Sequence, residues 1–272
     1  MIEDDMNETT NVILGTAFGY KIDAIAPFVL SWKRYCSNEP LILLIEPDCS
    51  QEKIDWLLDQ GVDIRFFTAS YWIPSAIHNT RYFKYLDILL EGRGYYNNVF
   101  LCDVRDLVFQ GNIFEQIPAG GLHAFQEDLA FTAGTERFNR SILINNYGEA
   151  EIKFFEDKPI ICSGTTLGDA ESIIQYIVAL INERNLEQMQ RAGGIPDEQA
   201  CHNWIFHKNL LPHTQHVNGD GVATICLTHP NKIRVDGDEL TIYGKRPAVV
   251  HQWDRHPNLV EHYNKLYVKD LA

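Results

Sequence analysis

The chain contains 272 residues, of which 45% are hydrophobic and 22% are charged, and its formal net charge at pH 7 is −14. A chain of this length and composition buries a sizeable core, so we predict one globular domain spanning residues 1–272. The acidic balance argues against nucleic acid as a partner, because two polyanions repel each other.

Targeting and redox signals are sparse. The sequence has no run of about 18 apolar residues, the length that a membrane-spanning helix needs, so we expect no integral membrane segment, while peripheral association stays open. Residues 1–8 are acidic and lack the basic and apolar regions of a signal peptide, so we expect a cytoplasmic protein with a flexible tail over residues 1–10. The six cysteines are scattered without a C-x-x-C pair, which predicts reduced thiols rather than disulfides or a zinc site.

The first 110 residues alternate short apolar runs with amphipathic segments. We predict strands over 11–18, 41–45, 62–67 and 99–102, separated by helices over 23–35, between Ser50 and Gly61, and over 75–91. This alternation predicts an α/β fold with a mostly parallel, Rossmann-type sheet flanked by helices. Ligands bind beyond the carboxyl ends of the strands in such sheets, where Thr16-Ala17-Phe18 and Asp103–Asp106 both lie.

The second half of the chain, residues 117–272, has a mixed α/β pattern. We predict a strand over 121–126, a short strand over 158–164 that enters a Gly-containing turn, helices over 169–190 and 197–207, strands within 222–250, and a final helix over 259–267. Pro196 is expected to open the helix over 197–207, and Asp236-Gly237 is expected to form a hairpin turn.

The segment Asp103-Val104-Arg105-Asp106 places three charged groups at the end of a predicted buried strand. Such charges are costly unless something compensates them. Two carboxylates can hold Mg²⁺ or Mn²⁺, which prefer oxygen ligands and leave positions open for phosphates. Arg105 can pair with an aspartate or with a diphosphate. The plain alternative is a structural ion-pair turn at the edge of the sheet.

With Leu107–Phe114 behind it, this segment resembles the D-x-D region of the GT-A glycosyltransferases. Further resemblances follow in the family's order. They are the helix 81–89, which in this family often carries a basic residue toward the nucleotide sugar, the acceptor-side turn 162–168, the D-Q-x-x-x-N-like helix start 197–203, and the late strand 250–252, whose His completes the metal site. The resemblance implies a GT-A-like fold, with a nucleotide-sugar-binding half over 11–116 and an acceptor-binding half over 117–272.

The spacing departs from the family pattern, because the two aspartates stand three positions apart instead of two. We favour Asp106 as a metal ligand, since the apolar run after it starts in the family's register. Asp103 then either binds the metal as well or contacts the ribose or a metal-bound water. In the alternative hypothesis, Arg105 stabilises the diphosphate and no metal is needed.

The resemblance implies an enzyme, a metal-assisted glycosyltransferase that uses Mn²⁺ or Mg²⁺. The donor is a nucleotide-diphosphate sugar, most simply a UDP-sugar, and the acceptor is a hydroxyl of a glycan, a lipid-linked sugar or a protein. One alternative is a sugar-phosphate nucleotidyltransferase, although the only cation near the Gly15–Gly19 loop is Lys21. The other is a non-catalytic glycan-binding or scaffold protein of the same fold.

The resemblance and the strand-end positions together assign residues to three roles. The expected metal ligands are Asp103, Asp106 and His251. The expected donor contacts are Thr16, Ala17, Tyr20, Arg81, Lys84, Asp103, Val104, Arg105, Ser163, Gly164 and Gln199. The candidates for binding or deprotonating the acceptor hydroxyl are Asp197, Glu198 and Glu127. For Asp197 and Glu198 the alternative is structural, because acidic residues favour helix N-termini.

Overall fold

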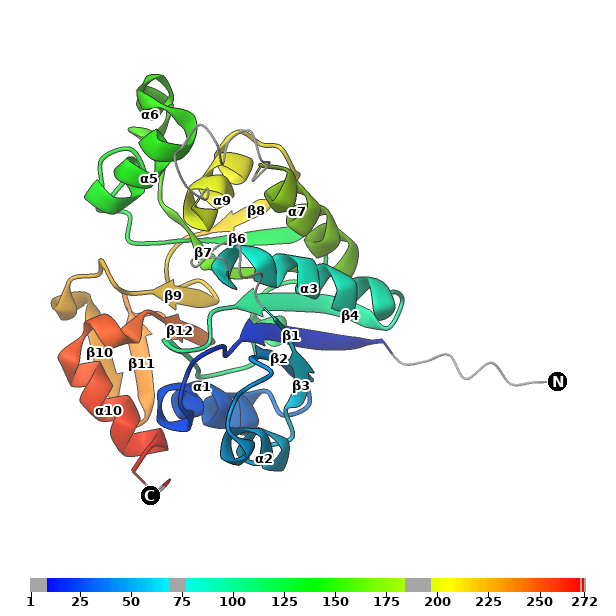
Figure 1. Cartoon of the computed structure of the whole chain (residues 1–272). Coiled ribbons are helices and arrows are strands. Elements are labelled where there is room, and N and C mark those ends of the chain that lie inside the picture. The colour runs from blue at the N-terminus through cyan, green and yellow to red at the C-terminus, as the bar shows by residue number, and fades with distance from the viewer. Residues whose placement is uncertain (1–8, 69–76, 184–196, 270, 272) are drawn as a thin grey trace.

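The structure is a computed structural model that describes residues 9–68, 77–183, 197–269 and 271, with the side chains of 77–79 left aside. A seven-stranded sheet forms its centre (Figure 1). Its strands are β1 (Thr10–Thr16), β2 (Leu41–Ile45), β3 (Asp63–Phe66), β4 (Tyr96–Cys102), β6 (Leu122–Gln126), β7 (Ile161–Asp169) and β8 (Thr214–His216).

The sheet has the strand order β3-β2-β1-β4-β7-β6-β8. Six strands run in the same direction, and β7 alone runs antiparallel to both of its neighbours, β4 and β6. The predicted α/β class with a mostly parallel sheet is therefore confirmed. The carboxyl ends of β1 and β4, which are hydrogen-bonded neighbours, lie at the same edge of the sheet.

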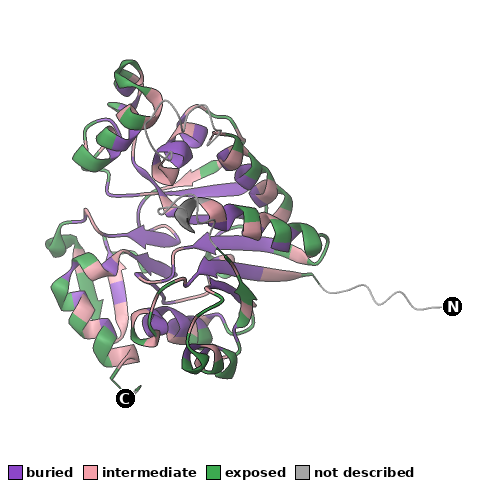
Figure 2. Cartoon of the chain, viewed as in Figure 1, coloured by how far each residue is buried: buried purple, intermediate pink, exposed green. Residues whose placement is uncertain are grey.

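Helices cover both faces of the sheet, because its inner strands are apolar on both sides. Ile13 and Leu43 pack toward α1 (Ile22–Tyr35) and α2 (Gln51–Asp59). Their neighbours Leu14 and Ile42 pack toward α3 (Ile77–Glu91), α7 (Ala170–Glu183) and α9 (Glu198–His207). Figure 2 shows buried strands between helices whose outer faces are exposed. Ser50 caps α2 as predicted, since its hydroxyl accepts a hydrogen bond from Lys53 N at 3.3 Å.

A second, three-stranded sheet joins the two halves of the chain. It has the order β5-β12-β9, formed by Leu107–Phe109, Val249–His251 and Val222–Thr224. β12 pairs antiparallel with β5, and the register sets His251 opposite Leu107. This pairing brings the end of β12 beside the Asp103–Asp106 segment.

The remaining elements lie around this second sheet and in the second half of the chain. The predicted hairpin consists of β10 (Ile233–Asp236) and β11 (Glu239–Ile242), with Gly237 at a φ of +60° in its turn. The helix α10 (Pro257–Tyr267) packs beside it. Short elements complete the chain, namely α4 (Ile113–Gln116), α5 (Arg137–Tyr147), η1 (Glu149–Glu151), α6 (Ile152–Phe155), η2 (Pro230–Lys232) and η3 (Trp253–Arg255).

The prediction for residues 158–164 was wrong in one respect. Gly164 does not turn the chain, because β7 continues through Gly168 to Asp169 with partners on both sides. Thr10 belongs to β1 instead of the expected tail. Residues 1–8, the first two positions of the helix predicted over 75–91, the end of the one predicted over 169–190, and Pro196 lie outside the described residues.

Two further expectations bear on composition. All six cysteines are free, and four of them are buried. Within the described ranges, no helix combines the length and the apolar character needed to cross a membrane.

Candidate metal centre and the cavities beside it

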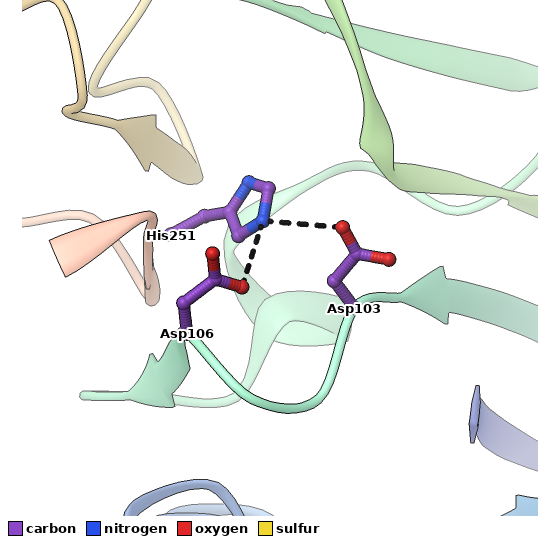
Figure 3. A group of neighbouring side chains, drawn as sticks. All are labelled: Asp103, Asp106 and His251. Atoms are coloured by element: carbon purple, nitrogen blue, oxygen red, sulfur yellow. Dashed lines mark ion pairs between the residues drawn. The ribbon is translucent and has the colours of Figure 1, made fainter. Parts of the chain in front are cut away.

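Asp103, Asp106 and His251 form one group of potential metal ligands (Figure 3). Asp103 follows β4, Asp106 precedes β5, and His251 ends β12. The His251 Nε2 atom lies 3.6 Å from Asp103 Oδ2 and 3.5 Å from Asp106 Oδ1. All three ligand atoms lie within 4.8 Å of one another. Both aspartates face the imidazole, so the three-residue spacing lets each of them reach the centre.

The residues of this centre fit a divalent metal ion. His251 is fully buried, and its Nε2 finds no hydrogen-bond partner among the residues that the structure describes. Its distances to the two carboxylates exceed those of a good hydrogen bond. An ion between the three atoms would satisfy the orphaned nitrogen. One imidazole and two carboxylates form a donor set that suits Mn²⁺ and, less well, Mg²⁺.

Gly164 makes room for this centre from the adjacent strand. A Cβ at this position would lie 2.4 Å from His251 Cε1 and 2.6 Å from Asp103 Oδ2. The Gly164 carbonyl also accepts a hydrogen bond from Asp103 N at 2.9 Å. Glycine is thus required here by close approach, not by a turn. On the far side of the ring, Cys162 Sγ lies 3.4 Å from His251 Nδ1.

Arg81 fixes the orientation of Asp103. Its buried guanidinium lies 2.8 Å from Asp103 Oδ1 and 2.7 Å from Glu198 Oε1, which leaves Asp103 Oδ2 facing His251. Burial alone would raise the pKa of Asp103, but Arg81 and His251 outweigh that effect and hold the pKa well below its usual range. Asp103 is therefore a carboxylate anion, the form that a metal requires.

Two half-exposed arginines flank the other aspartate. Arg105 lies 3.3 Å from Asp106 Oδ2 and 2.8 Å from Asp254 Oδ2. Arg255 lies 3.9 Å from the same Asp106 oxygen. Both guanidinium groups also pair with Asp254, and both arginines line the neighbouring cavity.

That cavity, which we call the arginine cavity, has a volume of about 180 Å³. It brings together seven predicted residues with three others. The lining residues are Thr16, Phe18, Tyr20, Arg81, Asp103, Val104, Arg105, Asp106, Gln252 and Arg255. The expected convergence of the β1 and β4 strand ends thus forms one cavity.

A second cavity, which we call the acidic cavity, adjoins the same centre and has a volume of about 410 Å³. Asp103, Gln252 and Arg255 line both cavities, so the metal-ligand group lies between them. The other lining residues of the acidic cavity are Glu127, Glu136, Phe138, Asn139, Cys162, Ser163, Gly164, Gln199, Cys226 and Leu227.

Glu127 is the buried carboxyl group of the acidic cavity. Its Oε2 lies 3.7 Å from the thiol of Cys226, which donates to it. Burial raises the pKa of Glu127 from 4.5 to about 7. A carboxyl group with this pKa exchanges its proton near neutral pH, as a general base must.

Gln252 occupies the junction of the two cavities in an unusual conformation. Its backbone is left-handed, with φ 58° and ψ 36°, which few non-glycine residues adopt. Its N–H donates to the carbonyl of Asp106 at 2.7 Å. The buried Oε1 atom has no hydrogen-bond partner within the described part of the chain. A strained residue with an unpaired polar group at a cavity junction is a candidate ligand contact.

Gln199 connects β7 and α5 through side-chain hydrogen bonds at the wall of the acidic cavity. Its Oε1 accepts from Ser163 N at 2.7 Å, while its Nε2 donates to Ile161 O at 3.0 Å and to Asn139 Oδ1 at 3.1 Å. Glu136 caps α5 by accepting from the backbone N–H groups of Phe138 and Asn139. These bonds hold Phe138 at the cavity with its ring exposed.

Besides His251, which belongs to the metal-ligand group, four predicted site residues are absent from the described lining of both cavities. The Ala17 carbonyl accepts from Lys53 Nζ at 2.7 Å. Lys84 lies 4.0 Å from Asp87 on α3. Asp197 caps α9, accepting from Gln199 N at 2.9 Å, and Glu198 pairs with Arg81.

The structure also adds lining residues that are outside the three sets of expected site residues. Gln252 and Arg255 follow His251 closely, and this proximity was the signal that could have identified them. Phe138, Asn139 and Cys226 carry no such signal, because their segments meet the cavity only through tertiary packing.

Comparison of the sequence with models of known protein families and with curated proteins gave no match. The chain's fold and site define an α/β protein with a candidate metal centre between two cavities at the carboxyl edge of its parallel strands.

Proposed function

We propose that this chain is a metal-assisted glycosyltransferase that moves a sugar from a nucleotide-diphosphate sugar, most simply a UDP-sugar, to a hydroxyl acceptor. The observation that carries the proposal is the position of the Asp103–Asp106–His251 group between a cavity edged by arginines and a cavity that holds the buried carboxyl group of Glu127. Transfer between two substrates needs both of them held side by side at one reacting centre.

The arginine cavity suits the diphosphate of the donor. Arg105 and Arg255 supply positive charge at its edge, and Tyr20 offers an aromatic face for the nucleoside. A divalent cation held by the three ligands would neutralise the charge that develops on the leaving diphosphate. Arg81 lies deeper and keeps Asp103 in place.

The acidic cavity suits the acceptor. Glu127, with its pKa near 7, would take the proton of the attacking hydroxyl, which leaves the acceptor oxygen free to form the new glycosidic bond. Gln252 lies where donor sugar and acceptor would meet, and its unpaired Oε1 can accept a hydrogen bond from either. Asp197 and Glu198 are occupied by a helix cap and by Arg81, so Glu127 is our preferred base.

A thermal-shift panel of UDP, GDP, ADP and CDP, each with Mn²⁺ or with EDTA, tests the donor half of this proposal. We expect at least one diphosphate to raise the melting temperature with Mn²⁺ and not with EDTA. Asp106→Asn should abolish the shift, whereas Asp63→Asn, which alters an exposed ion pair on β3, should keep it. No shift with any diphosphate in the wild type, or equal shifts in both variants, contradicts the proposal.

A further inference from the structure

A third cavity of about 460 Å³ lies beside the acidic cavity, and we call it the apolar cavity. It is walled mainly by apolar atoms. Its lining residues are Asp128, Leu129, Ala130, Val217, Asn218, His229, Lys232, Tyr243 and Lys245. Its volume falls within the range of sites that bind small organic groups.

The apolar cavity continues the acidic cavity along two segments of the chain. Glu127 lines the acidic cavity, and the next residues, Asp128 to Ala130, line the apolar cavity. Leu227 lines the acidic cavity, and His229 lines the apolar one. Two separate segments thus pass from the lining of one cavity to the lining of the other, which makes the two cavities neighbours.

Apolar side chains around the cavity are left unusually open. Leu129 is 59% exposed. Tyr243 is also exposed. Its backbone is in the left-handed region, with a φ of 52°, which is strained for an aromatic residue. Its hydroxyl donates to Asp128 Oδ2 at 2.6 Å, which fixes the ring at the wall nearest the acidic cavity. A concave site walled mainly by apolar atoms, with a few polar groups, is typical of small-molecule binding sites.

From these observations we infer that the acceptor is a glycoside with an apolar aglycone. Its hydroxyl-bearing sugar occupies the acidic cavity, and its alkyl or aryl group occupies the apolar cavity. This inference rests on the proposed transferase function for the identity of the acceptor. A single hollow of this volume fits one chain or ring of a small ligand better than it fits a flat membrane surface or a second copy of the protein.

Calorimetric titration without nucleotide and without metal tests this inference separately from the donor site. The probes are octyl β-D-glucoside, octyl β-D-galactoside and octyl β-D-mannoside below their micellar concentrations, each compared with its methyl counterpart. Val217→Asp places a charge in the apolar cavity. Val235→Asp is the matched control, because Val217 and Val235 are 40% and 39% exposed and Val235 lies on β10, outside the described lining. Leu129→Ser serves as a second cavity variant, and unchanged Mn²⁺ affinity shows that each variant is folded.

We expect at least one octyl glycoside to bind at least tenfold more tightly than its methyl counterpart in the wild type and in Val235→Asp, and to lose that gain in Val217→Asp and Leu129→Ser. Equal affinity for octyl and methyl glycosides, no octyl binding, or equal behaviour of Val217→Asp and Val235→Asp overturns the inference. Sedimentation with phosphatidylcholine–phosphatidylglycerol vesicles that depends on Val217 without octyl glycoside binding assigns the surface to a membrane and also overturns it. Self-association in sedimentation velocity that Val217→Asp abolishes assigns it to a second copy, with the same consequence.

Discussion

The His251 Nε2 atom lies 3.5 Å from Asp106 Oδ1, although the two residues come from opposite halves of the chain. The β12–β5 register produces this contact, because it sets His251 opposite Leu107, the residue after Asp106. The second sheet therefore assembles the candidate metal centre, and the parallel sheet positions it above the carboxyl end of β4.

Loss of the imidazole should remove most of the metal affinity. We expect His251→Ala to weaken Mn²⁺ binding by about 100-fold or more, beyond the roughly 10–100-fold that follows loss of an outer-shell partner. Titration followed by electron paramagnetic resonance of free Mn²⁺ measures the change. His229→Ala removes an exposed imidazole and should bind Mn²⁺ like the wild type. Equal affinities for His251→Ala and wild type would show that the centre holds no metal.

A methyl group at Gly164 should disrupt the same centre sterically. Its Cβ would overlap the His251 ring and Asp103, so we expect Gly164→Ala to lose Mn²⁺ binding and to destabilise the fold by about 1–3 kcal/mol. Gly111→Ala is the control, since its Cβ would meet nothing closer than 3.7 Å. Chemical denaturation and Mn²⁺ titration check both variants. A Gly164→Ala protein with wild-type stability and metal affinity would contradict the close approach described above.

Glu127 predicts a specific pH dependence. Its pKa is raised in the folded protein from 4.5 to about 7, so the folded state favours the protonated form. Ionisation therefore costs stability as the pH rises through this window, and Glu127→Gln should be more stable than wild type at pH 8 by up to about 3 kcal/mol and no more stable at pH 4. Denaturation midpoints at the two pH values measure this difference.

The same carboxyl group should control transfer. We expect kcat of the wild type to rise with pH to a plateau above about pH 7, as Glu127 loses its proton, and Glu127→Gln to lose at least about 100-fold in kcat. If Glu127→Gln gains stability at pH 8 and still transfers sugar at the wild-type rate, Glu127 is buried as described but is not the catalytic base.

Substitution of Gln252 by glycine distinguishes the effect of backbone strain from the function of the side chain. Gln252→Gly relieves a left-handed strain of about 1–2 kcal/mol and adds chain entropy of about 0.5–1 kcal/mol to the unfolded state, so stability should hold or rise slightly. Loss of the side chain should lower kcat at least about tenfold. Asn209→Gly, at a φ of 53° outside the described cavity linings, should match it in stability and keep full activity. If both variants remain fully active, Gln252 contacts no substrate.

Much of the fold was predictable because local patterns determine it. The fully buried run Leu41–Ile45 and the hydroxyl cap at Ser50 are visible in the sequence. The course of β7 was not, because Gly164 and Gly168 suggest a turn when only the chain is considered. Their small size instead serves close packing, against His251 in one case and against the Gly121 carbonyl in the other.

The site residues at the converging strand ends were predictable from the sequence. Those that reach the site only through tertiary packing were less predictable. Asp103, Asp106 and His251 were grouped in advance through a family resemblance, and the structure brings them together. The sequence could not choose among Asp197, Glu198 and Glu127 as the base. Asp197 serves as a helix cap, while Glu127 owes its pKa to burial that only the folded chain creates.

Release of nucleoside diphosphate from a panel of nucleotide sugars, measured with Mn²⁺ and with EDTA, tests the central claim most directly. The account predicts Mn²⁺-dependent release from at least one nucleotide sugar, stimulated by a hydroxyl acceptor, lost in Asp106→Asn and retained in Asp63→Asn. No release from any nucleotide sugar, or release that is equal with Mn²⁺ and with EDTA, would contradict it.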